Sequence, residues 1–330
     1  MENDLFNRRN WLKAGLGLAA GSAFSGFSFS PRNPADDCKH TPKQEFGPFP
    51  VMKKRSQADH DIDLTKVEGQ PGIAAGDIIF VKGKIHDELC NPISGAIVEI
   101  WQTNHFGKYH HEYQLEPKED PNFQGWGQAI TAADGSYQFK TIIPSAYARR
   151  TRHIHFKVSR RGFHDMITQL YFEGEPLNEK DGILNSLSHE DQQQVVRTLN
   201  KSGAIPVVDF HLMLEAVKEG AVPAKVLAEY NGKYKMLVDD DSMLKGLLKN
   251  NIKGNFSDLT VEFFNEGDQF FFSMPFTPKT ELTWKSKDRF DATYFYRCDL
   301  VFLRGTDGKV NKMQFLFIKG GVFVEGDKIS

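Results

Sequence analysis

Apolar and polar residues alternate along several short segments of the chain, and this alternation is typical of strands that bury one face. In "DGSYQFKTI" (residues 134–142), Tyr137 and Phe139 alternate with Gln138 and Lys140 directly after an Asp-Gly turn signal. Similar strand-like segments are "DIIFVKGKIHD", "GAIVEIWQ", "RHIHFKVS", "MITQLYFEG" and "IPVVDFHLML". Closely spaced short strands of this kind predict an antiparallel β-sandwich.

Helical patterns are few. The segment "SHEDQQQVVRTLN" predicts a short helix that begins after Ser188, with Asp191 three residues further on as a capping signature. Beyond the linker-like "EAVKEGAVPAK", Phe-rich strand-like segments continue to the C-terminus. We therefore predict a mainly all-β chain with one or two short helices, in which a second, small antiparallel β-domain follows the sandwich. The expected boundaries are a signal segment at 1–33, the β-sandwich at 34–217, a linker at 218–226 and the small β accessory domain at 227–330.

The overall composition is that of an ordinary globular protein, with 40% hydrophobic and 25% charged residues and a formal net charge of -2. A charge so close to zero gives no basic field for nucleic acid. At the N-terminus, Arg8 and Arg9 precede a moderately apolar, Gly- and Ala-rich run that ends near Phe27. This pattern resembles a twin-arginine signal, which would make the export machinery a partner and the periplasm the expected location. The alternatives are an amphipathic first helix or a short membrane anchor.

The chain contains three cysteines, Cys38, Cys90 and Cys298. Because an exported protein meets an oxidising compartment, we expect a disulfide between Cys38 and Cys90, which share the first domain, with Cys298 left free. Three free thiols remain the alternative. None of the cysteines lies in a CxxC pair, so the sequence does not indicate a zinc ribbon.

The segment "YARRTRHIHFKV" (residues 147–158) places two histidines one residue apart. His153, His155 and Lys157 alternate with apolar residues, so a half-buried strand would point both imidazoles to the same side. Two neutral imidazoles on one face can share a transition metal ion. Two surface or hydrogen-bonded histidines without any ligand would fit the same pattern.

Three longer blocks occur in order along the first domain: "GKIHDELCNPISGAIVEIWQTNHFGKYHH", "AADGSYQFKTIIPSAYARRTRHIHFKV" and "TQLYFEG". Together they resemble the intradiol ring-cleavage dioxygenase family, whose members include protocatechuate 3,4-dioxygenase and catechol 1,2-dioxygenase. The resemblance covers roughly residues 41–214. The three ordered blocks are much more specific than an isolated pair of histidines.

The resemblance implies a non-haem Fe3+ ion held by two tyrosines and two histidines. The matching residues are Tyr109 after the "WQ" block, Tyr147 after the "TIIP" turn, and His153 and His155 on the predicted strand. Anionic phenolates favour the higher charge of Fe3+, and imidazoles supply neutral ligands. In the family the second tyrosine leaves the metal when the substrate binds, and this role falls to Tyr147. Either tyrosine could instead be an ordinary strand-end aromatic residue.

Two further catalytic positions match the family. Arg150 lies where the family carries an arginine that stabilises charge on the substrate ring, and Gln169 matches a glutamine next to the metal ligands. The chain departs from the family in two places: only five residues separate Tyr147 from His153, and Pro50 stands where many members have an aromatic residue. Both departures leave the substrate open.

The resemblance thus implies an oxidoreductase that opens a catechol-type ring between its two hydroxylated carbons with O2 and yields a cis,cis-muconate-type diacid. Every assigned residue lies between Tyr109 and Gln169, so we expect the first domain to carry the reaction alone. The alternative is a non-enzymatic exported β-protein that binds a glycan or another ligand and contains a structural metal. A zinc hydrolase that uses His153 and His155 would lack a carboxylate ligand. The sequence leaves open the particular catechol, the oligomeric state and the role of residues 227–330.

Overall fold

The structure is a computed structural model that describes residues 38–47, 60–111, 117–218, 222–237, 259–274, 277, 279–317 and 320–330. The expected signal segment with Arg8 and Arg9, and the departure at Pro50, lie outside these residues. The described chain is mainly β, as predicted, and contains two short α-helices. Within the described ranges, no helix is long and apolar enough to cross a membrane.

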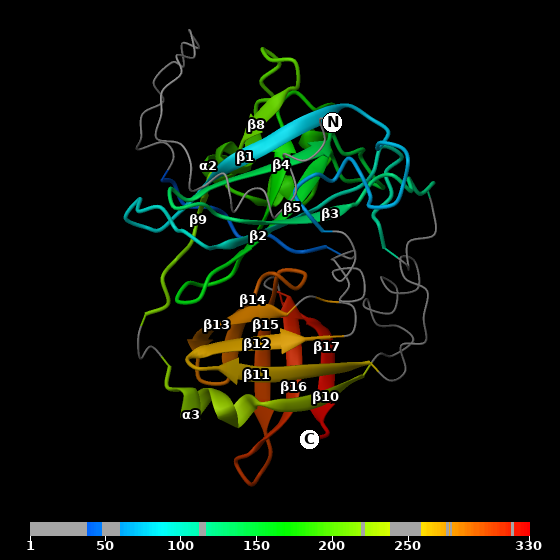
Figure 1. Ribbon diagram of the computed structural model, residues 1–330. Helices are drawn as coiled ribbons and strands as arrows, with labels where there is room; N and C mark the ends of the chain where they lie inside the picture. Colours follow the sequence, from blue (N-terminus) through cyan, green and yellow to red (C-terminus); the bar gives the residue numbers. More distant parts are fainter. Residues whose placement is uncertain are drawn as a thin grey trace.

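The first part of the chain forms two sheets (Figure 1). In the four-stranded sheet the order is β4-β1-β8, and β9 also pairs with β1. Its strands are β1 (Ile78–His86), β4 (Ser136–Ile142), β8 (Val207–Asp209) and β9 (Leu212–Met213). In the five-stranded sheet the order is β3-β2-β5-β6-β7. Its strands are β2 (Ile97–Trp101), β3 (Trp126–Ile130), β5 (His153–Ser159), β6 (Met166–Phe172) and β7 (Val196–Arg197).

One hydrophobic cluster fills the space shared by these two sheets, because alternate apolar side chains of both point into it. The long strands pair antiparallel, as the sequence predicts. Three short strands do not: β8 and β9 pair parallel to β1, and β7 pairs parallel to β6. These strands enter the sheets through long connections rather than tight hairpins, and long connections permit parallel pairing.

The last part of the chain is a closed barrel of eight strands, each antiparallel to its neighbours. The strands are β10 (Gly232–Leu237), β11 (Thr260–Glu266), β12 (Gln269–Ser273), β13 (Thr280–Ser286), β14 (Arg289–Ala292), β15 (Cys298–Arg304), β16 (Val310–Phe317) and β17 (Val322–Lys328). Closure leaves no exposed sheet edge. The interior is packed with aromatic rings, including those of Tyr234, Phe263, Phe270 and Phe302.

Helices are short and lie outside the sheets. They are α2 (His189–Val195), α3 (Ala224–Leu227) and the 3-10 turns η2 (Pro176–Lys180), η3 (Leu184–Ser186) and η4 (Ala228–Tyr230). The predicted capping of α2 is confirmed, because the Ser188 side chain accepts a hydrogen bond from the Asp191 backbone N–H. The predicted disulfide between Cys38 and Cys90 is also present, and Cys298 is free and buried.

The sequence prediction of a half-buried β5 is wrong in one respect, because both faces of this strand are covered. Ile154, Phe156 and Val158 point into the core between the two sheets. His153, His155 and Lys157 share the opposite face, as predicted, yet all three are buried. We call this the outer face of the five-stranded sheet. A second hydrophobic cluster covers it and joins it to the barrel; the members of this cluster from the first part of the chain are Phe46, Trp101, Tyr109, Trp126 and Ile167.

Candidate metal centre

Strand β5 brings the two histidines together on the outer face. Their ring centroids lie 4.8 Å apart. The hydroxyl oxygen of Tyr109 lies 3.0 Å from Nε2 of His153 and 3.1 Å from Nε2 of His155. Three of the four ligand candidates named from the sequence therefore converge on one point, although Tyr109 lies more than forty residues from the histidines.

The fourth candidate, Tyr147, borders the same point. Its ring centroid is 5.2 Å from that of Tyr109 and 5.8 Å from that of His153. The short connection between Tyr147 and His153 begins as a tight turn, in which the Arg150 N–H donates to the Tyr147 carbonyl oxygen at 2.8 Å. The turn sets Tyr147 and Arg150 beside each other at the edge of the histidine pair.

Burial controls the charge of these four groups. It lowers the pKa of His153 to about 3 and that of His155 well below its ordinary value, with nearby positive charge adding to the effect. Both imidazoles are therefore neutral, as metal ligands must be. Burial also raises the pKa of Tyr109 and of Tyr147, so a nearby cation is needed to ionise the phenols.

The donor set suits a hard, highly charged ion. Among the described residues, no group of three or more His, Cys, Asp or Glu side chains could hold a metal ion. A centre at this point therefore depends on phenol oxygens together with the two imidazoles. Two phenolates and two neutral nitrogens favour Fe3+ over softer ions, so the residues present fit the iron that the resemblance implies.

The two imidazoles are fixed in different ways. Nδ1 of His153 lies 2.6 Å from the Thr151 carbonyl oxygen, to which it can donate, leaving Nε2 to face Tyr109. Nδ1 of His155 is buried and has no hydrogen-bond partner among the described residues. Its ring stacks instead on Trp101, the cross-strand neighbour on β2, with centroids 4.8 Å apart and planes 3° from parallel. Packing on Trp101 and the contact of Nε2 with the Tyr109 hydroxyl therefore orient this ring.

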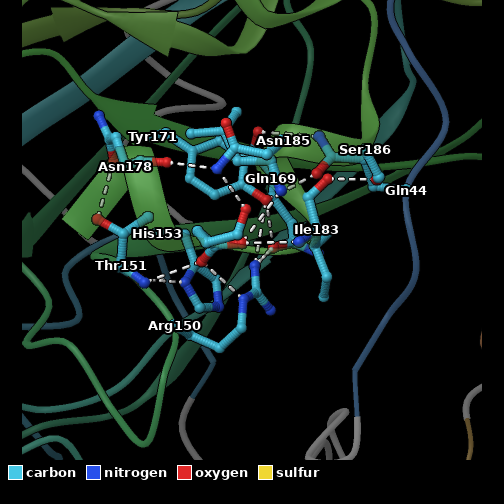
Figure 2. A network of polar contacts seen from close by, with 12 residues as sticks. Gln44, Arg150, Thr151, His153, Gln169, Tyr171, Asn178, Ile183, Asn185 and Ser186 are labelled. Carbon is cyan, nitrogen blue, oxygen red and sulfur yellow. Dashed lines mark hydrogen bonds and ion pairs between the residues drawn. The ribbon is translucent and has the colours of Figure 1, made fainter.

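Arg150 and Gln169 lie together beside His153 (Figure 2). Nη2 of Arg150 donates to Oε1 of Gln169 at 2.7 Å and to the Tyr171 hydroxyl at 3.1 Å. Gln169 stands opposite His155 in the β5–β6 register, and its amide donates to the Glu45 carbonyl oxygen at 2.9 Å. Gln169 therefore holds the guanidinium group in place.

Asp181 is the main residue of this network that the sequence analysis missed. Its carboxylate is fully buried and accepts hydrogen bonds from Arg150 Nε at 2.8 Å and from the Thr151 N–H at 2.9 Å. Burial acts to raise the pKa of Asp181, but the Arg150 charge and the backbone donors hold it below its ordinary value. The Asp-Gly pair at 181–182 signals only a turn, so nothing in the sequence pointed to this pairing.

The segment before the first strand also reaches the centre. Gly47 has a φ of 71°, and a Cβ at this position would lie 3.3 Å from Cε1 of His155. A side chain here would strain the backbone and crowd the imidazole, so glycine lets the chain pass close to His155. The neighbouring Phe46 packs against Phe295 of the barrel, with ring centroids 6.0 Å apart.

Comparison with known proteins identifies the family of this chain. A family model described as "Dioxygenase" matches residues 49–220, more than half of the chain. The protocatechuate 3,4-dioxygenase beta chain of Burkholderia cepacia is 34% identical over 175 residues, which cover 50% of this chain and 74% of that protein. Catechol 1,2-dioxygenase 2 of Acinetobacter lwoffii is 26% identical over 152 residues, 38% of this chain and about half (54%) of that protein.

A solved structure also matches the first part of the chain. It is the dioxygenase domain of a dioxygenase–carbohydrate-binding protein fusion from Streptomyces sp. SirexAA-E, with 27% identity and a TM-score of 0.43, and it covers 54% of this chain and 100% of that chain. The family model and the curated relatives show that this chain belongs to the intradiol ring-cleavage dioxygenase family.

Proposed function

We propose that the protein is a non-haem Fe3+ dioxygenase that opens a catechol-type ring between its two hydroxylated carbons and yields a cis,cis-muconate-type diacid. The observation that carries this proposal is the convergence of the Tyr109 hydroxyl and Nε2 of both His153 and His155 within 3.1 Å, with Tyr147 at the edge. These four residues would hold the iron. We also propose that the two sheets around their shared core are the β-sandwich that the sequence predicts. The domain boundaries would be those predicted from the sequence.

The iron would supply a Lewis acid that polarises the two substrate oxygens and orients them. The chain's own residues supply the rest. Tyr147 is only partly buried and lies beside Arg150, so its phenolate is placed to accept a proton from the incoming catechol. Arg150 places a fixed positive charge next to the same position, where it stabilises negative charge that develops on the ring.

The remaining contacts keep this arrangement rigid and dry. Gln169 and Asp181 hold Arg150, while Trp101 holds the ring of His155. The barrel and the segment around Phe46 and Gly47 cover the outer face, so water is kept away from the imidazoles. Preorganised charge in such a site acts more strongly than it would in water.

The test is metal content together with oxygen uptake. As isolated, the full-length protein should be red-brown because of charge transfer from phenolate to Fe3+, with about one iron per chain and little zinc. With catechol, protocatechuate or hydroxyquinol in an oxygen electrode, at least one substrate should consume one O2 per ring opened. A colourless protein that is fully active with zinc, or an iron protein inert toward all these substrates, would contradict the proposal.

Arg150 offers a more specific prediction. Arg150→Lys keeps a positive charge that can pair with Asp181 but loses the planar fork that also reaches Gln169 and Tyr171. We expect it to keep the iron and the colour and to lower kcat by about tenfold to a few hundredfold, the scale of one misplaced charge-stabilising donor. Arg149→Lys, an exposed neighbour, is the matched control and should leave kcat unchanged. Loss of iron in Arg150→Lys would reassign this residue to a structural role.

We also propose export through the twin-arginine machinery to the periplasm, on the pattern that follows Arg8 and Arg9. The Cys38–Cys90 disulfide supports this location, because such bonds persist in oxidising compartments. Cell fractionation decides the matter: recovery of the mature protein only in the cytoplasm would contradict export.

A further inference from the structure

The barrel is fixed over the strand that carries the histidines (Figure 1). Lys157 follows His155 by two residues on β5, and its Nζ donates to the Lys279 carbonyl oxygen at 2.5 Å. Glu281 on β13 accepts a hydrogen bond from the Asp165 N–H at 2.6 Å. Lys157, Asp165 and Glu281 are all buried, so these contacts hold β13 in one position relative to β5 and β6.

The connection between β14 and β15, residues 293–297, contacts the segment that passes the candidate centre; we call it the barrel turn. The hydroxyl of Tyr294 donates to the Asp165 carbonyl oxygen at 2.5 Å. The backbone carbonyl oxygen of Tyr294 accepts a hydrogen bond from the Phe46 N–H at 3.2 Å. Phe46 directly precedes Gly47, the residue that passes close to His155. The barrel turn therefore contacts the segment that passes His155, a candidate iron ligand.

Tyr296 of this turn packs against the same hydrophobic cluster as Tyr147, and both tyrosines are partly buried. Burial raises the pKa of the Tyr296 phenol, and Glu45 and Tyr147 lie near enough to raise it further. The Tyr296 ring is 5.2 Å from Phe295 and 5.2 Å from Phe323, centroid to centroid. Barrel aromatics thus pack against Tyr296.

The backbone of the turn has an unusual conformation. Tyr296 and Arg297 have φ angles of 51° and 55°, in the left-handed region that is unfavourable for residues other than glycine. Surrounding contacts must hold such a conformation, and strained residues cluster at sites that bind ligands. Arg297 also lies close enough to Glu45 to oppose, together with Arg150, the effect of burial on the Glu45 pKa. The turn and the arginine beside Tyr147 therefore approach the same carboxylate.

We propose that the barrel turn forms one wall of the substrate site and that Tyr296 is a specificity-determining residue, which limits the size of the ring substituent accepted beside Tyr147. The substrate class is then a catechol whose ring carries no bulky group on the barrel side. This inference rests on the proposed dioxygenase function, because that function places a catechol ring next to Tyr147. The barrel would then contribute a residue to the substrate site, whereas the sequence predicts that the first domain carries the reaction alone.

The test uses the full-length iron protein and measures binding without turnover. Dissociation constants for catechol and 4-tert-butylcatechol are determined under anaerobic conditions for the wild type, Tyr296→Ala and Tyr296→Phe. In Tyr296→Ala, the affinity for the butyl compound relative to catechol should rise by about 10- to 200-fold, the range over which pocket size discriminates between apolar groups. Tyr296→Phe keeps the ring and should stay within about twofold of the wild type.

Trp284→Ala is the matched control. Trp284 is a partly buried barrel aromatic that packs on Tyr230 and Phe290, and the affinity ratio should not change when it is truncated. If Tyr296→Ala does not retain iron, Tyr296→Leu replaces it in the test, because leucine keeps an apolar side chain against Phe295. The affinity for 4-tert-butylcatechol relative to catechol in that variant then tests the proposal.

If the affinity for 4-tert-butylcatechol relative to catechol is unchanged in an iron-loaded Tyr296→Ala or Tyr296→Leu variant, Tyr296 does not line the substrate site. This conclusion would hold even if the wild type cleaves catechol. A wild type that binds iron but no catechol would instead overturn the proposed function. Aerobic kcat/KM values for the same two compounds should follow the affinity ratio.

Discussion

His155→Ala is expected to abolish the red-brown colour and to lower catechol-dependent oxygen uptake by more than about a thousandfold. The imidazole is fully buried, and its Nε2 lies 3.1 Å from the Tyr109 hydroxyl, so no other described side chain stands in the same position. Removing it takes away one of four iron ligands and leaves a gap beside Trp101. Metal chemistry is worth several kcal/mol of barrier, and each 1.36 kcal/mol is a factor of ten in rate.

The measurements are iron per chain, the visible absorption spectrum and the rate of oxygen uptake. His110→Ala is a useful control, because His110 directly follows Tyr109 but is exposed and contacts Glu119. We expect this variant to keep its iron and at least half of the wild-type rate. If His155→Ala retained full iron and colour, the metal would have to lie elsewhere in the chain.

The alternation of residues along β5 was sufficient to predict that His153 and His155 share a face. It could not show that the face is covered. Alternation reports which side of a strand is polar, and a polar side normally faces water. Here Lys157 and both imidazoles are buried because a second domain lies on top of them, and this covering depends on contacts more than a hundred residues away in sequence.

The same limit applies to the residues around Arg150. Block resemblance assigned Arg150 to the substrate ring and Gln169 to a place next to the metal ligands, but it did not predict their mutual contact at 2.7 Å. Asp181 and Glu45 were missed because their roles come from chain packing rather than from a motif. Acidic residues in turns are usually solvated, so nothing in the sequence pattern indicates a fully buried carboxylate at position 181.

The barrel was predicted only as a small antiparallel β-domain, without its closure or its position. Turn-punctuated aromatic segments indicate strands, but they do not specify that β10 pairs with β17. Nor do they show that Tyr109 belongs to the cluster between barrel and sheet rather than to the core of the first domain. A candidate ligand thus depends on the barrel for its surroundings, which argues against the expectation that the first domain carries the reaction alone.

Asp181→Ala should be the most destabilising single change near the site. The carboxylate pairs with the partly buried Arg150 and also accepts the backbone N–H groups of Thr151, Ile183 and Leu184 at 2.9–3.0 Å. Removing one partner of a buried ion pair leaves the other charge uncompensated, which costs about 3–5 kcal/mol. We therefore expect the free energy of unfolding in urea at pH 7 to fall by this amount.

Asp134→Ala is the matched control, because Asp134 is an exposed turn carboxylate paired with Lys84, and its loss should cost about 1 kcal/mol or less. Asp181→Asn removes the negative charge of the side chain but keeps its size and shape, so it tests the effect of the charge alone. The folded-state pKa of Asp181 lies below its ordinary value, so the carboxylate stabilises the fold above the unfolded-state pKa, and this contribution is lost as pH falls through the folded-state pKa. The deficit of Asp181→Asn should therefore be largest near neutral pH and shrink in acid. A deficit that is small at pH 7 or grows as pH falls would show that the Asp181–Arg150 pair does not hold this side of the site.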